Sequence, residues 1–330
     1  MRKTSFLFVA LPLVSFSLLA ACGGSEAASD GADLTNQVET SNWAQLSSPT
    51  VTEPCGTIGT PPLTYRHLIW ILMENKQYSD VIGNTNAPYL SDLATQCASA
   101  THWNDAGSTY NSLPNYIALT TGITDSATLN PFKCNCPPSA TVHTTKNNIF
   151  RQVRAKGKTE KSYAEGMPSN CAYAGGTLYA VIANPALYMW GGSDRIACTN
   201  DDVPMGSNTM GAFIDDLNND TLPTFSFVAP NLCNDMHDCS VSAGDDFLSV
   251  LVPQILASPA YSSGRTALVI LWDEDSPIPN VVIAPSVVPG TVVTTTIDHY
   301  SLLRATESML ALPYLLGAQT AVDMRGPFNL

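Results

Sequence analysis

Two short apolar segments of this sequence end abruptly in polar residues, and this pattern constrains the fold more than any other feature. Leu268–Trp272 is followed by three acids in the stretch "TALVILWDED", and Leu68–Met73 is followed by Glu74 and Asn75 in "YRHLIWILMEN". Apolar runs without alternation are typical of strands that are covered on both faces. A buried carboxylate at a strand end is costly unless a positive charge lies near it. The sequence therefore predicts inner strands whose acidic ends need a cation.

Strand-like and helix-like segments alternate along the chain. The expected strands are Leu68–Met73, Thr224–Val228, Leu268–Trp272 and Val281–Ala284. Segments with helical spacing of apolar residues are 87–99, 147–158, 211–220, 247–258 and 300–312. This alternation predicts an α/β layered sandwich with a mostly parallel sheet. Because ligands in such folds bind beyond the carboxyl ends of the strands, both acid-bearing ends are expected at one rim.

The first 22 residues have the pattern of an export signal. Arg2 and Lys3 precede an apolar core at Phe6–Leu18, and small residues then lead to Cys22. This pattern resembles a bacterial lipoprotein signal, in which Cys22 carries the lipid; an ordinary secretory signal with an incidental cysteine is the alternative. We expect an exported protein, lipid-anchored on the periplasmic or cell-surface side of the membrane.

The remaining chain divides into a tether and one domain. Residues 23–60 begin with small polar residues that suit a flexible tether, and residues 61–330 are long enough for one large α/β domain without an internal repeat. No later segment has the length and apolarity of a transmembrane helix. The sequence says nothing about the oligomeric state.

Eight cysteines remain after Cys22, and an even number in an exported chain favours disulfides. Local pairs such as Cys171–Cys198 and Cys233–Cys239 fit this expectation, although the connectivity does not follow from the sequence. A structural zinc site is the rival interpretation, but the chain has no Cys-x-x-Cys motif.

The acidic charge of the chain restricts its partners. Lysine and arginine number 15 against 28 acids, which gives a formal net charge of −13. Nucleic acid is therefore not an expected partner, because phosphate backbones bind basic surfaces. The same charge opposes any anionic substrate, and a bound metal cation would solve that problem locally.

The polar strand ends supply a ligand set for a hard divalent ion. Carboxylate and amide oxygens are available from Glu74, Asn75, Asp273 and Glu274. The alternative is that these acids reach solvent or cap a following helix.

The stretch "STYNSLPNYIALTTG" places Ser112 at the start of a segment with helical character. The N-terminus of a helix favours an anion, because free backbone N–H groups point out of it. Ser112 is therefore either a simple cap or a nucleophile for a phosphorus atom, activated by metal contact.

Two histidines are further candidates. His237 lies in "PNLCNDMHDC", between two cysteines and directly after a predicted strand, while His299 begins the predicted helix in "DHYSLLRATE". Either imidazole could donate to a phosphate oxygen. The alternatives are a surface loop for His237 and a position near a helix cap for His299.

Five motifs in order carry a resemblance to a known family. "WILMENKQYSDVIGNTNAPYLSDLA", "NSLPNYIALTTG", "PNLCNDMHDC", "LWDED" and "DHYSLLRATESMLAL" span roughly residues 66–312. Together they resemble the phosphoesterase family, which includes bacterial acid phosphatases and non-specific phospholipases C within the alkaline-phosphatase-like superfamily. The resemblance implies a three-layer αβα sandwich and one divalent ion, which could be calcium, magnesium, manganese or zinc.

The resemblance also implies roles for individual residues. The implied metal ligands are Glu74, Asn75, Ser112, Asp273 and Glu274. The implied catalytic residues are Ser112 as nucleophile with His237 and His299 beside the phosphoryl oxygens. The implied substrate-binding residues are Asn115, Glu165 and Asp235.

The chain departs from the family pattern at two places. A His-Pro pair often precedes the nucleophile in the family, and here Tyr110 and Asn111 take those positions. Many members carry Lys-His-Asn-Pro, whereas this chain has Ile182 and Ala183 in place of the Lys and His. These departures put protonation of the leaving group in question.

The expected activity is hydrolysis of phosphate monoesters through a phosphoserine, with the metal cancelling charge on the ester. The substrate would be a small phosphate ester or a phospholipid headgroup. The alternatives are a phospholipase C-like phosphodiesterase and a ligand-binding lipoprotein of the same fold with impaired catalysis.

Overall fold

The computed structural model describes residues 52–107, 110–206 and 210–330, which all belong to one compact unit. The predicted signal segment, Cys22 and the tether up to residue 51 lie outside the described residues. The rest of the predicted tether is fastened to the domain, because Cys55 forms a disulfide with Cys97 and the Ile58 N–H donates to Pro285 O at 3.0 Å. The domain therefore includes Cys55 and Ile58, which precede the predicted boundary at residue 61. No helix within the described ranges is long and apolar enough to cross a membrane.

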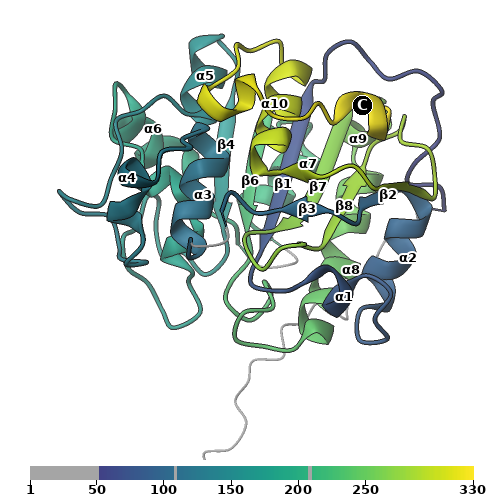
Figure 1. Cartoon of the computed structure of the whole chain (residues 1–330), viewed down its shortest axis with the longest axis horizontal. Coiled ribbons are helices and arrows are strands. Elements are labelled where there is room, and N and C mark those ends of the chain that lie inside the picture. The colour runs from purple at the N-terminus through teal and green to yellow at the C-terminus, as the bar shows by residue number, and fades with distance from the viewer. Residues whose placement is uncertain (1–51, 108–109, 207–209) are drawn as a thin grey trace, which may run out of the picture. The chain divides into compact units, whose positions relative to one another are not determined.

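The centre of the fold is an eight-stranded sheet with the order β5-β4-β6-β1-β7-β8-β2-β9 (Figure 1). Neighbouring strands are parallel except that β8 is antiparallel to both β7 and β2. The strands are β1 His67–Met73, β2 Ala98–Ala100, β4 Glu160–Ala164, β5 Asp202–Pro204, β6 Phe225–Ala229, β7 Thr266–Trp272, β8 Asn280–Ile283 and β9 Thr291–Val293. A separate parallel pair joins β3 Trp103–Asn104 to β10 Ile297–Asp298. The predicted mostly parallel sheet is confirmed.

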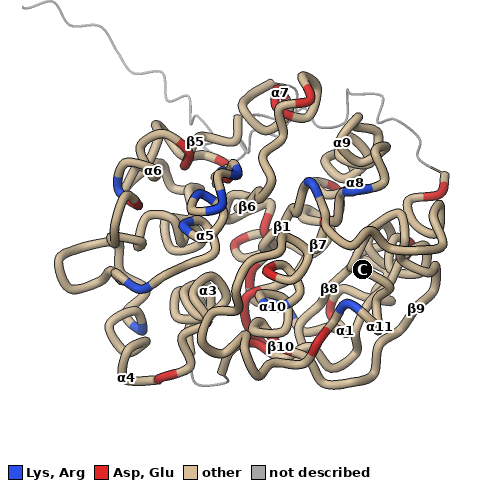
Figure 2. Tube along the Cα trace, turned by 90° about the horizontal axis from the view of Figure 1, so that it is seen from above, with Lys and Arg blue, Asp and Glu red and all other residues tan. Residues whose placement is uncertain are grey.

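Helices cover both faces of the sheet, as Figure 2 shows from above. On one face, α3 (Ser112–Thr121) packs against α10 (His299–Met309) and α5 (Ile149–Ala155). On the other face, α8 (Val241–Ala257) packs against α2 (Pro88–Gln96), α7 (Ala212–Asn218) and α9 (Pro259–Ser262). The shorter helices are α1 Tyr78–Val81, α4 Ser126–Leu129, α6 Asp194–Asp201 and α11 Arg325–Phe328. The expected αβα sandwich is therefore confirmed.

The four predicted strands are all present as β1, β6, β7 and β8, and the reason is burial. Strand β1 pairs with β6 on one side and β7 on the other, and every residue from Leu68 to Met73 is buried. Trp70 packs edge-on against Phe225 with ring centroids 4.9 Å apart, and its indole N–H donates to Thr306 Oγ1 of α10 at 3.1 Å. A strand enclosed in this way needs apolar side chains on both faces.

Sequence patterns missed the shorter and more polar strands. The helix predicted over residues 87–99 ends at Gln96, and Ala98–Ala100 instead forms β2. Cys97 leaves helical geometry and is joined to Cys55 by a disulfide, so a tertiary link fixes the chain there. Strand β4 begins with Glu160 and Lys161, which do not resemble a buried run.

All eight cysteines among the described residues form disulfides. The pairs are Cys55–Cys97, Cys134–Cys136, Cys171–Cys198 and Cys233–Cys239. The two predicted local pairs are confirmed, and the structural zinc alternative is wrong because no thiolate is left to bind the metal.

Candidate active site

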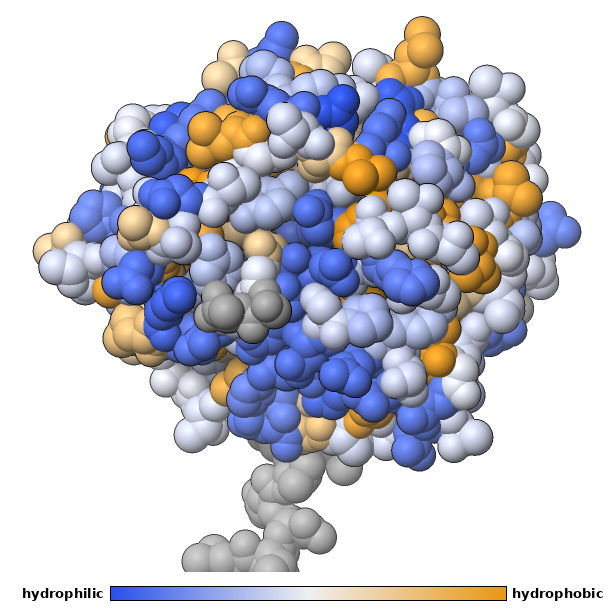
Figure 3. All heavy atoms as spheres, in the orientation of Figure 1, coloured by the Kyte–Doolittle hydropathy of each residue, from blue (hydrophilic) through white to orange (hydrophobic). Residues whose placement is uncertain are grey.

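The register of the central strands brings the two acid-bearing ends together. Met73 of β1 lies opposite Trp272 of β7, and the Asp273 N–H donates to Met73 O at 3.1 Å. The Glu74 N–H donates to the carbonyl of Asp235, in the loop after β6, at 2.9 Å. Three neighbouring strands therefore deliver acids to one place, and Figure 2 shows acidic residues gathered beside β1 and α10. Figure 3, in the orientation of Figure 1, shows hydrophilic residues gathered at the lower centre of the molecule.

Ser112 lies between two of these carboxylates. Its hydroxyl is 3.1 Å from Glu74 Oε2 and 3.0 Å from Glu274 Oε1, and the residue is buried. Ser112 is the first residue of α3, whose N-cap Asn111 makes no side-chain cap bond to the helix. A hydroxyl at a helix N-terminus lies where backbone N–H groups favour an anion.

Asn75 lies among the three carboxylates. It adopts a left-handed backbone conformation with φ 43°, which asparagine tolerates better than most residues, and its N–H donates to Asp273 Oδ1 at 3.1 Å. One terminal atom of its side-chain amide lies 3.0 Å from Glu74 Oε2, 3.1 Å from Glu274 Oε1 and 3.2 Å from Asp273 Oδ1. If that atom is nitrogen, it donates to the carboxylates; if it is oxygen, a cation must hold the group together.

The donor set fits a hard cation. The rim cluster, which comprises Glu74, Asn75, Ser112, Asp273 and Glu274, offers the carboxylate, amide and hydroxyl oxygens that hard divalent ions bind. Its Ser112 Oγ lies within 3.1 Å of oxygens of Glu74 and Glu274. Within the described residues, no lysine or arginine forms an ion pair with any of its three carboxylates. Asp273 Oδ2 is buried and has no hydrogen-bond partner among those residues.

Burial and like charges disfavour ionisation of the three acids of the cluster. Burial, and then the charge of Asp235, raises the pKa of Glu74 to about 8. Burial and the charges of Glu74 and Glu274 raise the pKa of Asp273 well above its usual range. Burial also raises the pKa of Glu274. Like charges in a desolvated site favour the protonated form until a cation compensates them.

A disulfide-bounded loop forms the next part of the rim. Glu165, which follows β4, accepts hydrogen bonds from Asn231 N and from Asn234 Nδ2, at 3.0 Å and 2.9 Å. Asp235 accepts from the His237 N–H at 2.8 Å through Oδ1, and its Oδ2 is buried without a partner in the described chain. Glu165 therefore holds the loop, while Asp235 keeps one oxygen available beside the cluster.

The two predicted histidines occupy different environments. His237 is exposed, and its Nδ1 lies 2.7 Å from Asp238 Oδ1. His299 is buried, and its Nε2 donates to the Asp273 carbonyl at 2.7 Å. Burial lowers the pKa of His299, so the ring is neutral, and its Nδ1 has no partner among the described residues. His299 therefore holds the strand end that carries Asp273.

Asn115 is buried one turn into α3. Its Oδ1 accepts from the Ala106 N–H at 3.0 Å, and its Nδ2 donates to Asn111 O at 3.3 Å. These bonds hold the segment before Ser112 against the helix.

Sequence reasoning missed Tyr116. Its hydroxyl donates to Glu74 Oε1 at 2.7 Å and the side chain is fully buried, so it fixes one oxygen of Glu74 while the other faces Ser112. The available signal was its spacing: residues four apart on a helix share a face, and Tyr116 is four residues after Ser112.

Comparison with known proteins identifies the family. The family model described as the phosphoesterase family matches residues 83–313, which is more than half of the chain. The chain belongs to the phosphoesterase family. It is a phosphoric ester hydrolase.

Two curated relatives support this assignment. A phosphatidylinositol-3-phosphatase from Mycobacterium tuberculosis is 31% identical over 274 residues, covering 80% of this chain and 84% of the relative. A probable acid phosphatase from Kluyveromyces lactis is 28% identical and covers 76% of this chain. The present chain spans 59% of the length of that yeast relative.

A solved structure agrees with the fold. An alkaline phosphatase superfamily protein from Vibrio parahaemolyticus aligns with a TM-score of 0.52 at 12% identity, covering 85% of this chain and 76% of that chain. This likeness concerns the arrangement of the sheet and helices alone.

The second departure from the family pattern falls on packed residues. Ile182 and Ala183 lie in the 3-10 helix η3, Val181–Ala183, which packs against α3. The following Asn184 donates to Asp202 Oδ1 at 2.8 Å and is buried. In this phosphoesterase the segment therefore supports the helix that carries the nucleophile candidate.

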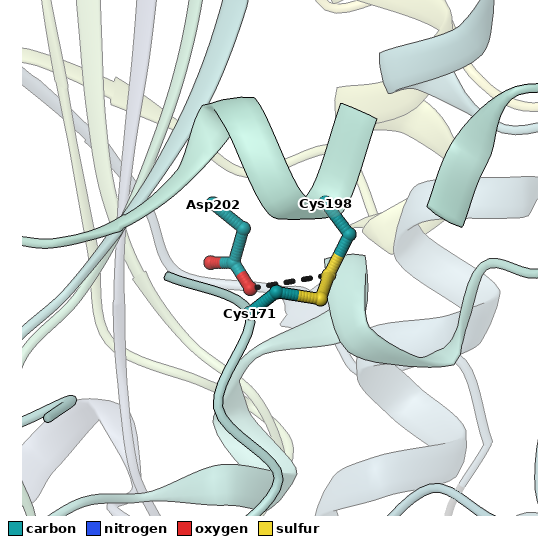
Figure 4. A group of neighbouring side chains, drawn as sticks. All are labelled: Cys171, Cys198 and Asp202. Carbon is teal, nitrogen blue, oxygen red and sulfur yellow. Dashed lines mark hydrogen bonds between the residues drawn. A yellow bond between two sulfur atoms is a disulfide. The ribbon is translucent and has the colours of Figure 1, made fainter. Parts of the chain in front are cut away.

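A second group with metal-binding residue types is not a metal site. Cys171, Cys198 and Asp202 lie close together in Figure 4. The two sulfurs are bonded to each other, so neither is available as a thiolate ligand.

Proposed function

We propose that this phosphoesterase is a metal-dependent phosphomonoesterase that works through a phosphoserine on Ser112. The observation that carries the proposal is the position of the Ser112 hydroxyl, which lies within 3.1 Å of two carboxylates at the N-terminus of a helix. A nucleophile, an anion-favouring helix end and a cation-seeking ligand set coincide there. This combination suits phosphoryl transfer, where positioning and charge stabilisation supply most of the catalysis.

The rim cluster would hold one divalent ion, which could be calcium, magnesium, manganese or zinc. When bound, this ion would cancel charge on the phosphate and lower the pKa of the attacking hydroxyl. The Ser112 hydroxyl lies between carboxylate oxygens of Glu74 and Glu274 and donates its single hydrogen to one of them, which holds Oγ in place.

The reaction has two displacements. The Ser112 hydroxyl gives its proton to the Glu74 or Glu274 carboxylate, Ser112 Oγ forms a bond to phosphorus, the ester P–O bond breaks, and the alcohol leaves with a proton from a donor of the site. Water then attacks the phosphoserine and releases phosphate. His237 is exposed beside Glu274 and is our candidate proton donor, while the neutral His299 keeps Asp273 in position.

We propose phosphorylated lipid headgroups as one substrate class, next to small soluble monoesters. The support is the mycobacterial relative, which is a phosphatidylinositol-3-phosphatase. Asn115, Glu165 and Asp235 lie around the cluster and would shape the substrate side of the site.

We also propose that residues 61–330 form the catalytic domain of an exported lipoprotein anchored through Cys22. The four disulfides support export, because they persist in oxidising compartments. Palmitate labelling and membrane fractionation of Cys22→Ser test the anchor: unchanged labelling or membrane retention would disprove it.

Substitution of Ser112 tests the function. Ser112→Ala should abolish turnover of p-nitrophenyl phosphate, with circular dichroism unchanged. Ser263→Ala is the matched control, because Ser263 is exposed just before the opposite end of β7 and its hydroxyl donates to Ala260 O. Full activity of Ser112→Ala would remove Ser112 from the mechanism.

The substrate class is tested in parallel on the wild-type chain with added metal. The assay compares p-nitrophenyl phosphate, bis-p-nitrophenyl phosphate, phosphatidylcholine vesicles and vesicles with a phosphatidylinositol monophosphate. The proposal predicts turnover of the monoesters. Preferred cleavage of the diester or of phosphatidylcholine would indicate a phospholipase C-like enzyme, and no turnover of any substrate would indicate a binding protein.

A further inference from the structure

One disulfide closes too short a loop to contribute much to the stability of the whole fold. Cys134 and Cys136 are two residues apart, whereas the other pairs are separated by 42, 27 and 6 residues. The loop-entropy contribution of a disulfide grows with the length of the loop that it closes. The Cys134–Cys136 bond therefore restricts mainly its own surroundings, and its function must be sought there.

Its surroundings are the residues on either side of Ser112. Asn111, which precedes Ser112, donates through Nδ2 to the carbonyl of Lys133 at 3.0 Å. Leu113, which follows Ser112, donates its N–H to Asn135 Oδ1 at 3.1 Å. The segment Lys133–Cys136, which we name the clip, thus holds the nucleophile from both sides.

The disulfide fixes the central residue of the clip. Asn135 lies between the two bonded cysteines and has a left-handed backbone with φ 48°. Its N–H donates to Phe132 O at 3.0 Å, and Tyr188 OH donates to Cys136 O at 3.0 Å. Phe132 and Tyr188 pack edge to face with centroids 6.2 Å apart, so the clip rests on a rigid aromatic support.

Asn135 has a specific effect on the helix end. Leu113 N–H is one of the first N–H groups of α3, which have no partner within the helix. Asn135 satisfies it with a side chain from another segment, as an N-cap residue would. The N-cap Asn111 makes no such bond, so the clip replaces the missing side-chain cap.

We propose that Asn135, held by the Cys134–Cys136 disulfide, is a positioning residue for Ser112, and that reduction of this disulfide slows phosphoryl transfer. The inference rests on the proposed function. A dithiol supplies two electrons and two protons: its thiolate attacks one sulfur, the S–S bond breaks, and a second exchange releases two protein thiols and the oxidised dithiol. The freed loop then loses the fixed geometry that holds Asn135 against Leu113.

Exposure makes this bond the accessible one. Cys134 is exposed, whereas Cys55, Cys97 and Cys198 are buried and Cys171, Cys233 and Cys239 are half-buried. Thiol–disulfide exchange requires access of a thiolate to sulfur, so a dithiol reaches Cys134 first.

Variants at Asn135 separate the effect of its side-chain acceptor from the effect of its backbone conformation. Asn135→Gly keeps the left-handed conformation and removes the acceptor, while Asn135→Asp keeps an acceptor at the same place. We expect kcat for p-nitrophenyl phosphate to fall about 10- to 100-fold in Asn135→Gly, as for a small misplacement of a reacting group. KM and metal affinity should stay near wild type, and Asn135→Asp should retain most of kcat. Equal kcat in wild type and Asn135→Gly would overturn the role of Asn135.

Reduction tests the disulfide. Wild-type enzyme treated with dithiothreitol in excess metal should lose kcat by a similar factor and regain it on reoxidation. Cys134→Ser/Cys136→Ser should have the low kcat from the start and should not respond to dithiothreitol. If the double variant has wild-type kcat, the inference is wrong. If it starts low but falls equally with dithiothreitol, the reductant acts through the metal or another disulfide, and the redox part fails.

Assay of Ser112→Ala on the same substrate distinguishes failure of the proposed function from failure of this inference. Activity in Ser112→Ala defeats the proposed function and this inference with it. An inactive Ser112→Ala together with fully active clip variants defeats only this inference.

Discussion

Two clusters of buried acids in the described chain are neutralised differently. The edge cluster, on β4, α6 and α7, consists of Glu160, Asp194 and Asp216. Arg154 pairs with both Glu160 and Asp194, Arg151 also pairs with Asp194, and Lys161 pairs with Asp216 at 2.6 Å. The rim cluster has no such partner in the described chain: its nearest lysine, Lys76, donates to the backbone carbonyls of Asn75 and Met236.

This difference separates structural acids from functional ones. The chain supplies its own cations to the edge cluster, and we propose that the rim acids take theirs from a bound ion. Removing one partner of a buried pair leaves an uncompensated charge and is strongly destabilising. Removing a charge from a cluster of like charges relieves repulsion instead. The same substitution should therefore act oppositely in the two regions.

The largest expected effect is on catalysis. Asp273→Asn should lower kcat/KM by at least about 100-fold, since even outer partners of metal ligands cost 10–100-fold. Asp194→Asn should leave kcat/KM of the folded enzyme within a few-fold. Steady-state kinetics at saturating metal measures both, and equal losses would erase the distinction between the clusters.

Stability should show the reverse order. Asp194→Asn should lower the free energy of unfolding by about 2–3 kcal/mol, below the 3–5 kcal/mol of a fully buried pair because its arginines are 20–24% exposed. Asp273→Asn in chelator should be at least as stable as wild type. Urea unfolding provides the comparison, and destabilisation by Asp273→Asn in chelator would contradict the account.

A substitution of Tyr116 tests whether the rim cluster binds metal. Tyr116→Phe removes the hydroxyl that donates to Glu74 Oε1, so we expect metal affinity to fall about 10–100-fold. Titration calorimetry measures it, with Tyr163→Phe as the control, because Tyr163 OH donates to Asp216 of the edge cluster. Identical metal affinity in all three proteins would mean that Tyr116 only packs.

The last prediction concerns the pH dependence of stability. Asp202 is buried beside the Cys171–Cys198 disulfide, and burial raises its pKa to about 8. Because the folded state holds a proton that the unfolded state releases above its ordinary pKa near 4, this group's contribution to stability is present at low pH and is lost as pH rises through about 8. Asp202→Asn should therefore flatten the fall in Tm between pH 5 and pH 8.5. An unchanged slope would show that Asp202 does not hold the proton.

The sequence predicts the parts of this molecule that repeat one physical signal. Leu68–Met73 and Leu268–Trp272 are buried on both faces, so their composition alone predicts inner strands, and the polar residues after them predict the rim. Short strands such as β2 and β5 depend on pairing partners far along the chain, which leave no local pattern.

The site was predictable to the same extent. Metal-ligand residue types and a serine at a helix start are visible in the sequence, whereas Tyr116 and Asn135 act through contacts that only the folded chain creates. His299 illustrates the limit: its position at the helix start was predicted, but its bond to the Asp273 carbonyl follows from packing.

The central claim is tested most directly by diffraction from crystals grown with manganese, measured at and away from the manganese absorption edge. We expect one anomalous peak among Glu74, Asn75, Asp273 and Glu274, with oxygens at about 2.0–2.6 Å and the Asn75 amide oxygen facing the ion. A site without a peak, with the Asn75 NH2 group donating to all three carboxylates, would contradict the account.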